Sequence, residues 1–159
     1  YAKLVDLLTG LNITKIYCSP FIRCLQTIHP YIETTHQEVY VDWGIQESFY
    51  HRLFHSHNYT ELSKQDKEFY NVSPIYKSTM KPNVLRYQES NRDFISRITD
   101  FFIKLKLENQ SSDETILICT HMGVINVLLS LFKIERTLKS LYKMGKVSTI
   151  INGKLKYLN

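Results

Sequence analysis

Apolar residues follow two spacings along this chain, and the alternation between them predicts its elements. Residues 1–8 place apolar side chains at i, i+3 and i+4, which predicts a helix, and Gly10 is typical of a helix end. Positions 13–18 are instead rich in β-branched and aromatic residues, which favours a strand. The same patterns then predict helices over 19–34, 89–107 and 124–132, strands over 38–41 and 115–120, and a closing hairpin over 147–158.

Local signals indicate where some of these elements begin or turn. Ser19 and Pro20 suit the cap and the first position of the helix that follows the first strand. Pro30 is expected to bend that helix, because proline removes an internal hydrogen bond. Asn152-Gly153 between two β-rich runs predicts the turn of the hairpin.

The order of elements predicts an α/β layered fold in one domain over residues 1–159, with no repeat or linker dividing it. The near-continuous apolar run at 115–120 is typical of a strand covered on both faces. Residues 48–89 are polar and aromatic with weak patterning, apart from a helix expected near 60–69. We interpret 48–89 as an inserted lid or specificity segment.

Composition excludes several classes of protein. The 159 residues are 43% hydrophobic and 22% charged with five Gly and four Pro, unlike disordered or collagen-like chains. No apolar run reaches the roughly 18 residues that cross a bilayer, so no membrane partner is predicted. The net charge of +5 comes from dispersed Lys and Arg. This charge can simply keep the protein soluble, form a surface that binds nucleic acid or an acidic protein, or attract a phosphorylated substrate to the site. It does not by itself indicate that the protein binds nucleic acid.

The cysteines indicate the compartment. Cys18, Cys24 and Cys119 are odd in number, and none forms a Cys-x-x-Cys pair. We interpret them as reduced thiols of an intracellular protein, cytoplasmic or nuclear.

Two strand-to-helix junctions carry the candidate chemistry. One leads from Cys18 through Ser19 to Arg23, and the other from Thr120 through His121 to Gly123. Ligands of α/β sheets bind at the carboxyl ends of strands, where helix N-termini attract anions. Arg23 can bind a phosphate bidentately or be a solvated arginine, and His121 can be a ligand group or a buried imidazole. Gly123 would let the backbone approach a ligand.

These residues resemble motifs of the histidine phosphatase superfamily, the phosphoglycerate-mutase-like fold. Residues 19–27, Ser-Pro-Phe-Ile-Arg-Cys-Leu-Gln-Thr, resemble its S-P-x-x-R-x-x-Q-T segment. Residues 44–47, Gly-Ile-Gln-Glu, fall where that family carries its acid, and residues 120–123, Thr-His-Met-Gly, resemble its second histidine motif. The amino-acid sequence of these motifs most resembles that of eukaryotic members of the family. These include fungal phosphatase-like proteins and the small phosphatase-like subunit of the RNA polymerase III general factor.

The resemblance implies a three-layer fold with a mostly parallel central sheet, and a role for each site residue. Arg23 and His121 would hold the phosphoryl oxygens, with Ser19 and Gly123 beside them. Glu47 would protonate the leaving oxygen and then activate water, or else be an exposed loop carboxylate. No metal or other cofactor is implied, because Arg23 and His121 supply the positive charge. The implied partner is a phosphorylated small molecule or phosphoprotein.

One motif of the family has no match. Its nucleophile is a histidine in an Arg-His-Gly motif after a first strand, whereas here His29 falls within a helix and the histidines at 51, 55 and 57 follow the acid loop. We expect the first strand to be missing upstream of this chain, the alternative being a protein that lacks it. The expected function is a metal-independent phosphomonoester hydrolase whose nucleophile lies outside this sequence, so the 159-residue chain alone is expected to be inactive. The alternative is an inactive phosphatase-like binding or assembly domain, such as a subunit of a transcription complex.

Overall fold

The computed structural model describes residues 2–48, 61–84, 89–109, 114–134, 148–151 and 154–157. Three predictions lie outside these residues: the hairpin turn at 152–153, the histidines at 51, 55 and 57, and most of the first part of the 48–89 segment. The helix expected near 60–69 is α3, Lys64–Phe69. The other predicted helices and strands fall within the described residues, apart from single residues at the chain start and the hairpin ends.

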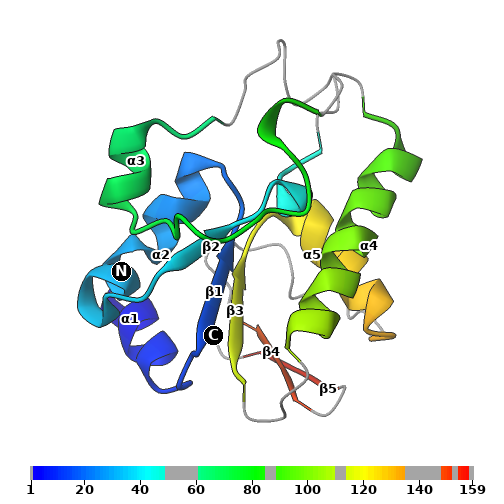
Figure 1. Cartoon of the computed structure of the whole chain (residues 1–159). Coiled ribbons are helices and arrows are strands. Elements are labelled where there is room, and N and C mark those ends of the chain that lie inside the picture. The colour runs from blue at the N-terminus through cyan, green and yellow to red at the C-terminus, as the bar shows by residue number, and fades with distance from the viewer. Residues whose placement is uncertain are drawn as a thin grey trace.

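Three parallel strands form the central sheet (Figure 1). They are β1 (Lys15–Cys18), β2 (Val39–Val41) and β3 (Ile116–Cys119), in the order β2-β1-β3. Cys18 is paired with Val41 on one side and with Cys119 on the other. The predicted α/β class and parallel sheet are therefore confirmed.

Helices cover both faces of this sheet. On one face α1 (Ala2–Thr9) and α2 (Ile22–Thr35) pack against Ile16 and Cys18, together with Val39 and Val41. On the other, α4 (Asn91–Glu108) and α5 (Met122–Leu131) pack against Tyr17. Successive residues of β1 thus point to opposite cores, as the two-residue period of a strand requires. The result is the expected three-layer arrangement.

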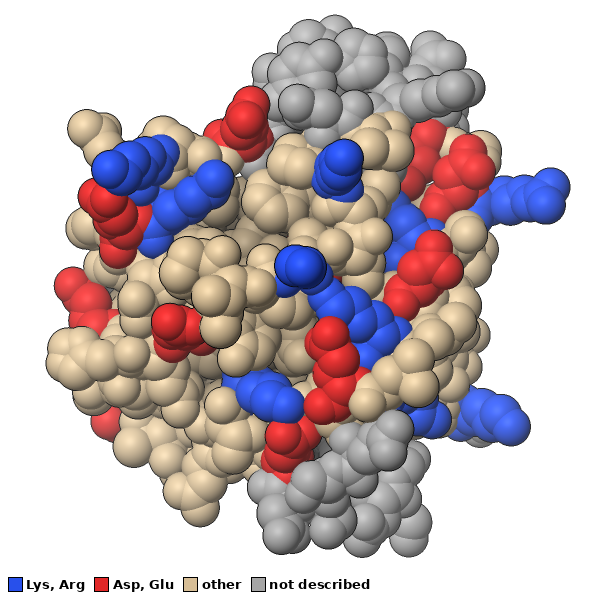
Figure 2. All heavy atoms as spheres, viewed as in Figure 1, with Lys and Arg blue, Asp and Glu red and all other residues tan. Residues whose placement is uncertain are grey.

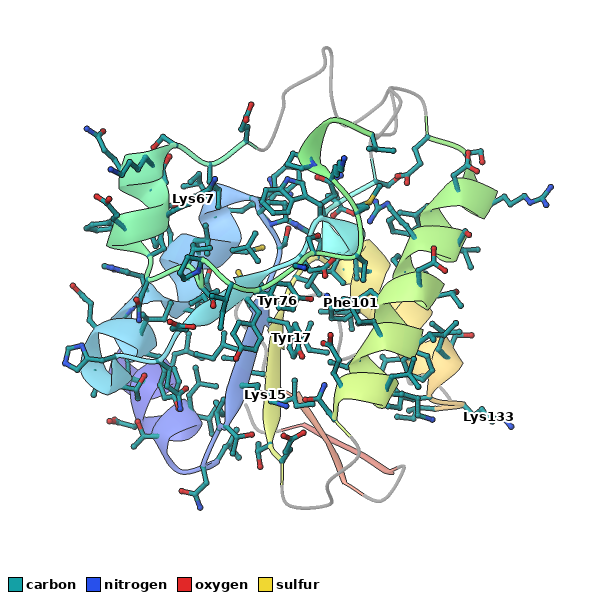
Figure 3. The ribbon with its side chains drawn as sticks, in the orientation of Figure 1. Lys15, Tyr17, Lys67, Tyr76, Phe101 and Lys133 are labelled. Carbon is teal, nitrogen blue, oxygen red and sulfur yellow. The ribbon has the colours of Figure 1, made fainter. Side chains whose placement is uncertain are left out.

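Aromatic rings pack in the core between the sheet and helices α4 and α5 (Figure 3). Tyr17 makes edge-to-face contacts with Tyr40, Tyr76 and Phe101, with ring centroids 5.4, 5.7 and 5.6 Å away. Tyr40 and Tyr76 stack on each other at 4.9 Å. Because Tyr76 belongs to the 48–89 segment, this packing attaches the middle of that segment to the sheet face.

The start of α2 differs from the prediction. The helix begins at Ile22, and its cap is Phe21, which makes no side-chain cap hydrogen bond. Ser19 was wrongly expected at this position; its hydroxyl lies 2.8 Å from Nε2 of His121 instead. The same hydroxyl also accepts a hydrogen bond of 3.4 Å from the amide of Phe21, and α2 continues through Pro30 to Thr35.

The edge at β3 also differs from expectation. All four residues of β3 are only partly buried, although their apolar run predicts a strand covered on both faces. Within the described residues no strand pairs with the side of β3 opposite β1. The predicted hairpin is confirmed, with β4 (Ser148–Ile151) antiparallel to β5 (Lys154–Tyr157) in a separate two-stranded sheet.

The described part of the 48–89 segment lies along β2. Its helix α3 starts with a capping box between Ser63 and Asp66, and Val72 forms a parallel bridge with Val39. Two short 3-10 turns complete the fold, η1 (Trp43–Ile45) after β2 and η2 (Pro82–Val84) before α4.

The surface carries charges of both signs. On the face seen in Figure 2, Lys and Arg are interspersed with Asp and Glu, as their dispersal along the sequence suggested. Among the helices of the described residues, none combines the length and the apolar character of a membrane span.

Candidate active site

The strand order determines where a ligand site can form. The chain passes from β1 to β2 on one side and later returns to β3 on the other side of β1. Crevices at the carboxyl ends of parallel strands open at such a switch point, here between β1 and β3. Ser19 directly follows β1, and Thr120 and His121 directly follow β3, so the two predicted junctions meet at this point.

Arg23, His121 and Ser19 form the centre of the site. A guanidinium nitrogen of Arg23 lies 3.0 Å from Nδ1 of His121, and the hydroxyl of Ser19 lies 2.8 Å from Nε2. Because arginine only donates, Nδ1 is the acceptor in this contact and Nε2 carries the proton that is donated to Ser19. Ser19 and His121 are buried, whereas Arg23 is exposed. The arrangement presents an exposed cation beside an imidazole that the fold holds rigidly.

An aromatic ring orients both groups. Phe21 lies under the guanidinium of Arg23, with 4.3 Å from Cζ to the ring centroid, and its edge-to-face contact with His121 has centroids 4.9 Å apart. Stacking on an aromatic face suits the planar guanidinium and restricts its position. The cation is therefore directed at the crevice although it is exposed.

Glu47 approaches the same imidazole nitrogen as Arg23. Its Oε2 is 3.8 Å from Nδ1 of His121, its side chain is 18% exposed, and Oε1 accepts a hydrogen bond of 3.0 Å from the amide of Ser48. Gly123 leaves room for this carboxylate, because a Cβ there would be 3.1 Å from Oε1 and 3.3 Å from the Phe94 ring. The five sequence-predicted site residues are thus brought together at the carboxyl ends of β1 and β3, and their roles stay predictions.

The loop that carries Glu47 is anchored by a buried carboxylate that the sequence analysis did not identify. Asp42 is 0% exposed and accepts four hydrogen bonds, from the amide of Gly44, from the hydroxyl and amide of Thr79, and from the phenol of Tyr76. Burial, and after it the neighbouring charge of Asp42, raises the pKa of Tyr76. Asp42 therefore connects the acid loop with the 76–79 stretch.

Two further residues contact this loop and were also missed. Arg97 of α4 donates to the backbone carbonyls of Gly44, Gln46 and Glu47, and Thr120 donates to that of Ile45. A detectable signal existed for Arg97, since it is a charged residue at a buried position of the α4 stripe, between Phe94 and Ile98. Thr120 was named in the second histidine motif, but its hydrogen bond to the loop was not predicted.

Buried thiols lie beneath the site. Cys24 Sγ is 3.7 Å from Nε2 of His121, and Cys119 Sγ is 3.5 Å from the carbonyl oxygen of Cys24. Burial raises the pKa of Cys18, and hydrogen bonding among the three thiols, together with burial, raises the pKa of Cys24 and Cys119. All three cysteines are free, as expected, and the raised pKa values keep them protonated.

The remaining described histidines lie elsewhere. His29 stacks on Phe69 with ring centroids 4.4 Å apart and lies 3.7 Å from Glu33, while His36 is exposed at the end of α2. Across the described ranges, no group of three or more His, Cys, Asp or Glu is arranged as a metal site. The described imidazole that faces the crevice is therefore that of His121.

Comparison with known proteins agrees with this arrangement. Residues 1–151 match the model of the histidine phosphatase superfamily (branch 1). A protein of Schizosaccharomyces pombe that is named a probable phosphatase is 30% identical over 137 residues, which are 84% of this chain and 57% of that protein. The chain therefore spans little more than half the length of this relative.

Proposed function

Since this chain belongs to the histidine phosphatase superfamily, we propose that the protein containing it hydrolyses phosphomonoesters through a phosphohistidine intermediate and without a metal ion. Membership and the similarity to a probable phosphatase support phosphatase activity. The phosphorylated substrate is a small molecule or a phosphoprotein. Glu47, Arg23 and His121 act in the reaction, and Ser19 and Gly123 shape the phosphate site.

A single observation carries the proposal: Arg23 and Glu47 approach the same imidazole nitrogen of His121, at 3.0 and 3.8 Å. A cation, an imidazole and a carboxylic acid close together are what phosphoryl transfer needs from its surroundings, because the transferred group spreads negative charge over its oxygens. Arg23 is free to donate bidentately to a phosphoryl group, since its guanidinium is exposed.

The reaction has two steps. In the first, a histidine nitrogen forms a bond to phosphorus while the ester P–O bond breaks, and protonated Glu47 gives its proton to the departing oxygen. In the second, the Glu47 carboxylate takes a proton from water, the water oxygen bonds to phosphorus, and the N–P bond breaks to release phosphate. A positioned acid and base of this kind contributes roughly 10²–10⁴-fold to the rate.

Among the described histidines, His121 is the one at the site, and it is assigned to phosphate binding. The nucleophilic histidine is therefore not among the described residues. The partly buried, apolar β3 supports a location for the nucleophile, since the described residues leave one of its edges without a paired strand. The carboxyl end of a parallel strand added there would face the same crevice as Ser19 and His121. We therefore propose that a strand paired with this edge of β3 carries the nucleophile.

The test measures hydrolysis of an aryl phosphate and of an alkyl phosphate by the full-length protein in the presence of EDTA. Arg23→Ala and His121→Ala are each expected to lower kcat/KM by at least about 10³-fold, as removal of groups that stabilise the transition-state charge does. Glu47→Gln is expected to slow the alkyl ester about 10²-fold or more and the aryl ester much less, because only the poor leaving group needs a proton. Quenching with alkaline detergent during turnover should trap a phosphoprotein that is stable in alkali and labile in acid.

Arg92→Ala is the matched control, because Arg92 is exposed on α4 outside the site. It should leave both rates unchanged. Equal loss on both esters in Glu47→Gln would contradict the acid role, and a phosphoserine or no phosphoprotein would contradict the mechanism. A full-length protein that binds inorganic phosphate but never turns over would be a binding or assembly domain instead.

A further inference from the structure

We propose that Arg97 and Glu89 are positioning residues that hold the acid loop, and thereby set the position of the Glu47 carboxyl relative to His121. The inference rests on the proposed acid role of Glu47 and adds two residues that do not themselves contact substrate. Arg97 comes from α4, and Glu89 lies two residues before its first residue, so a helix of the outer layer would set the geometry of the crevice.

The two side chains form a buried ion pair. Nε of Arg97 is 2.6 Å from Oε1 of Glu89, and an Nη nitrogen is 3.0 Å from Oε2, which makes the contact bidentate. The side chains are 6% and 1% exposed. A charge so deeply buried is tolerated only with a partner and with its donors satisfied, so Glu89 is needed to keep Arg97 in place.

The remaining donors of Arg97 go to the acid loop. One Nη donates to the carbonyls of Gly44 and Gln46 at 2.7 and 2.9 Å, and the other donates to the carbonyl of Glu47 at 3.2 Å. Together with the two contacts to Glu89, this occupies all five N–H groups of the guanidinium. Arg97 has no donor left for a phosphoryl oxygen, in contrast to the exposed Arg23.

Thr120 donates the remaining side-chain hydrogen bond to the carbonyls of the acid loop. Its hydroxyl donates to the carbonyl of Ile45 at 2.6 Å, so each of the four consecutive carbonyls from 44 to 47 accepts a side-chain hydrogen bond. Thr120 immediately precedes His121, and Gly44 is also held through its amide by Asp42. The backbone that carries Glu47 is therefore bonded both to α4 and to the residue next to His121.

A lysine cannot replace this arginine. The ammonium has three donors in a compact group, whereas the loop and Glu89 need five donors spread over a planar fork. Arg97→Lys keeps the charge that Glu89 requires but releases part of the loop. A displacement of about 1 Å at a catalytic group lowers the rate by about 10²-fold.

The experiment compares Arg97→Lys with Arg92→Lys, the same substitution at an exposed position of the same helix, in the full-length protein. We expect Arg97→Lys to lower kcat/KM for an alkyl phosphate about 10²-fold and kcat/KM for an activated aryl phosphate less than about 3-fold, which reproduces the pattern of Glu47→Gln. A merely structural role would reduce both rates by the same factor. In a Glu47→Gln background, Arg97→Lys should have little further effect on either ester.

Hydrogen–deuterium exchange provides a readout that does not depend on turnover. In Arg97→Lys the amides of 42–48 should exchange at least about 10-fold faster while those of β1 and α2 are unchanged; in Arg92→Lys neither should change. Should Arg97→Lys fail to fold, Glu89→Gln takes its place in all three measurements, since it removes the charge and keeps the shape.

Three results would each overturn the inference. Arg97→Lys could slow both esters equally, its loss of rate could add to that of Glu47→Gln in the double variant, or it could leave amide exchange at 42–48 unchanged. Failure of the proposed function has a different signature, because wild-type protein would then show no turnover, or Glu47→Gln would show no leaving-group dependence. In that case the exchange measurement still decides whether Arg97 holds the loop.

Discussion

Replacement of Asp42 by Asn is expected to destabilise the fold by about 4 kcal/mol. The carboxylate is fully buried and accepts four hydrogen bonds, two of them from the backbone amides of Gly44 and Thr79. These two amides bind different oxygens of Asp42. Whichever way the Asn side chain is oriented, its NH2 group therefore faces a backbone N–H that cannot turn away.

The magnitude follows from this geometry. A hydrogen bond to a charged group contributes about 1.5–3 kcal/mol, and a neutral acceptor makes bonds of roughly half that strength. With the lower of these values, the loss of one bond and the weakening of the other three give about 4 kcal/mol, which corresponds to a fall in Tm of roughly 8–16 °C for a chain of this size. Activity should fall as well, because Asp42 binds the start of the loop that carries Glu47.

The assay is thermal and urea unfolding followed by circular dichroism. Asp100→Asn, an exposed aspartate on α4, is the control and should change the free energy of unfolding by less than about 0.5 kcal/mol. A loss of less than 1 kcal/mol in Asp42→Asn would refute the reasoning, since it would mean that the four bonds do not stabilise the folded state.

Two further predictions concern the crevice and the thiols beneath it. Gly123→Ala should cost about 1–3 kcal/mol and slow hydrolysis of alkyl esters, because the added methyl would stand 3.1 Å from the Glu47 carboxylate, whereas Gly10→Ala, with no neighbour closer than 3.7 Å, should do neither. Alkaline pH should destabilise the fold through the thiols with raised pKa values, those of Cys18, Cys24 and Cys119. The unfolded chain releases these protons near pH 9 and the folded chain retains them, so the free energy of unfolding should fall above that pH by up to about 1.4 kcal/mol per pH unit for each thiol. Urea titrations at pH 8 and pH 10 under reducing conditions measure this, and equal values at the two pH values would contradict it.

Local sequence was sufficient for the elements of the fold. Runs of β-branched and apolar residues located β1 and β3, and helical spacing located α4, each within a few residues. The predicted start of α2 was wrong by about two residues, since the helix begins at Ile22. The hydroxyl of Ser19 accepts from the amide of Phe21, as a local cap would, but it also contacts the imidazole of His121, which the local sequence does not indicate.

Some residues of the candidate site could likewise be predicted from the local sequence, and others could not. Arg23 and His121 could be selected from the sequence because each follows a strand at the start of a helix, a context that recurs in anion sites. Asp42 and Arg97 could not be assigned. Apart from Gly44 for Asp42 and Glu89 for Arg97, their partners are backbone groups and side chains between 34 and 53 residues away in the chain, and a spacing pattern carries no information about such contacts.

By itself, then, the sequence determined the α/β class, the elements and the residues that carry the candidate chemistry, since these depend on local periodicity and on side-chain type. The tertiary structure alone decided how they are arranged. The strand order β2-β1-β3 places two distant junctions in one crevice, and buried hydrogen bonds from Arg97, Thr120 and Asp42 orient the loop of Glu47. Those bonds are strong because they are buried, and burial is a property of the packed chain and not of any segment of it.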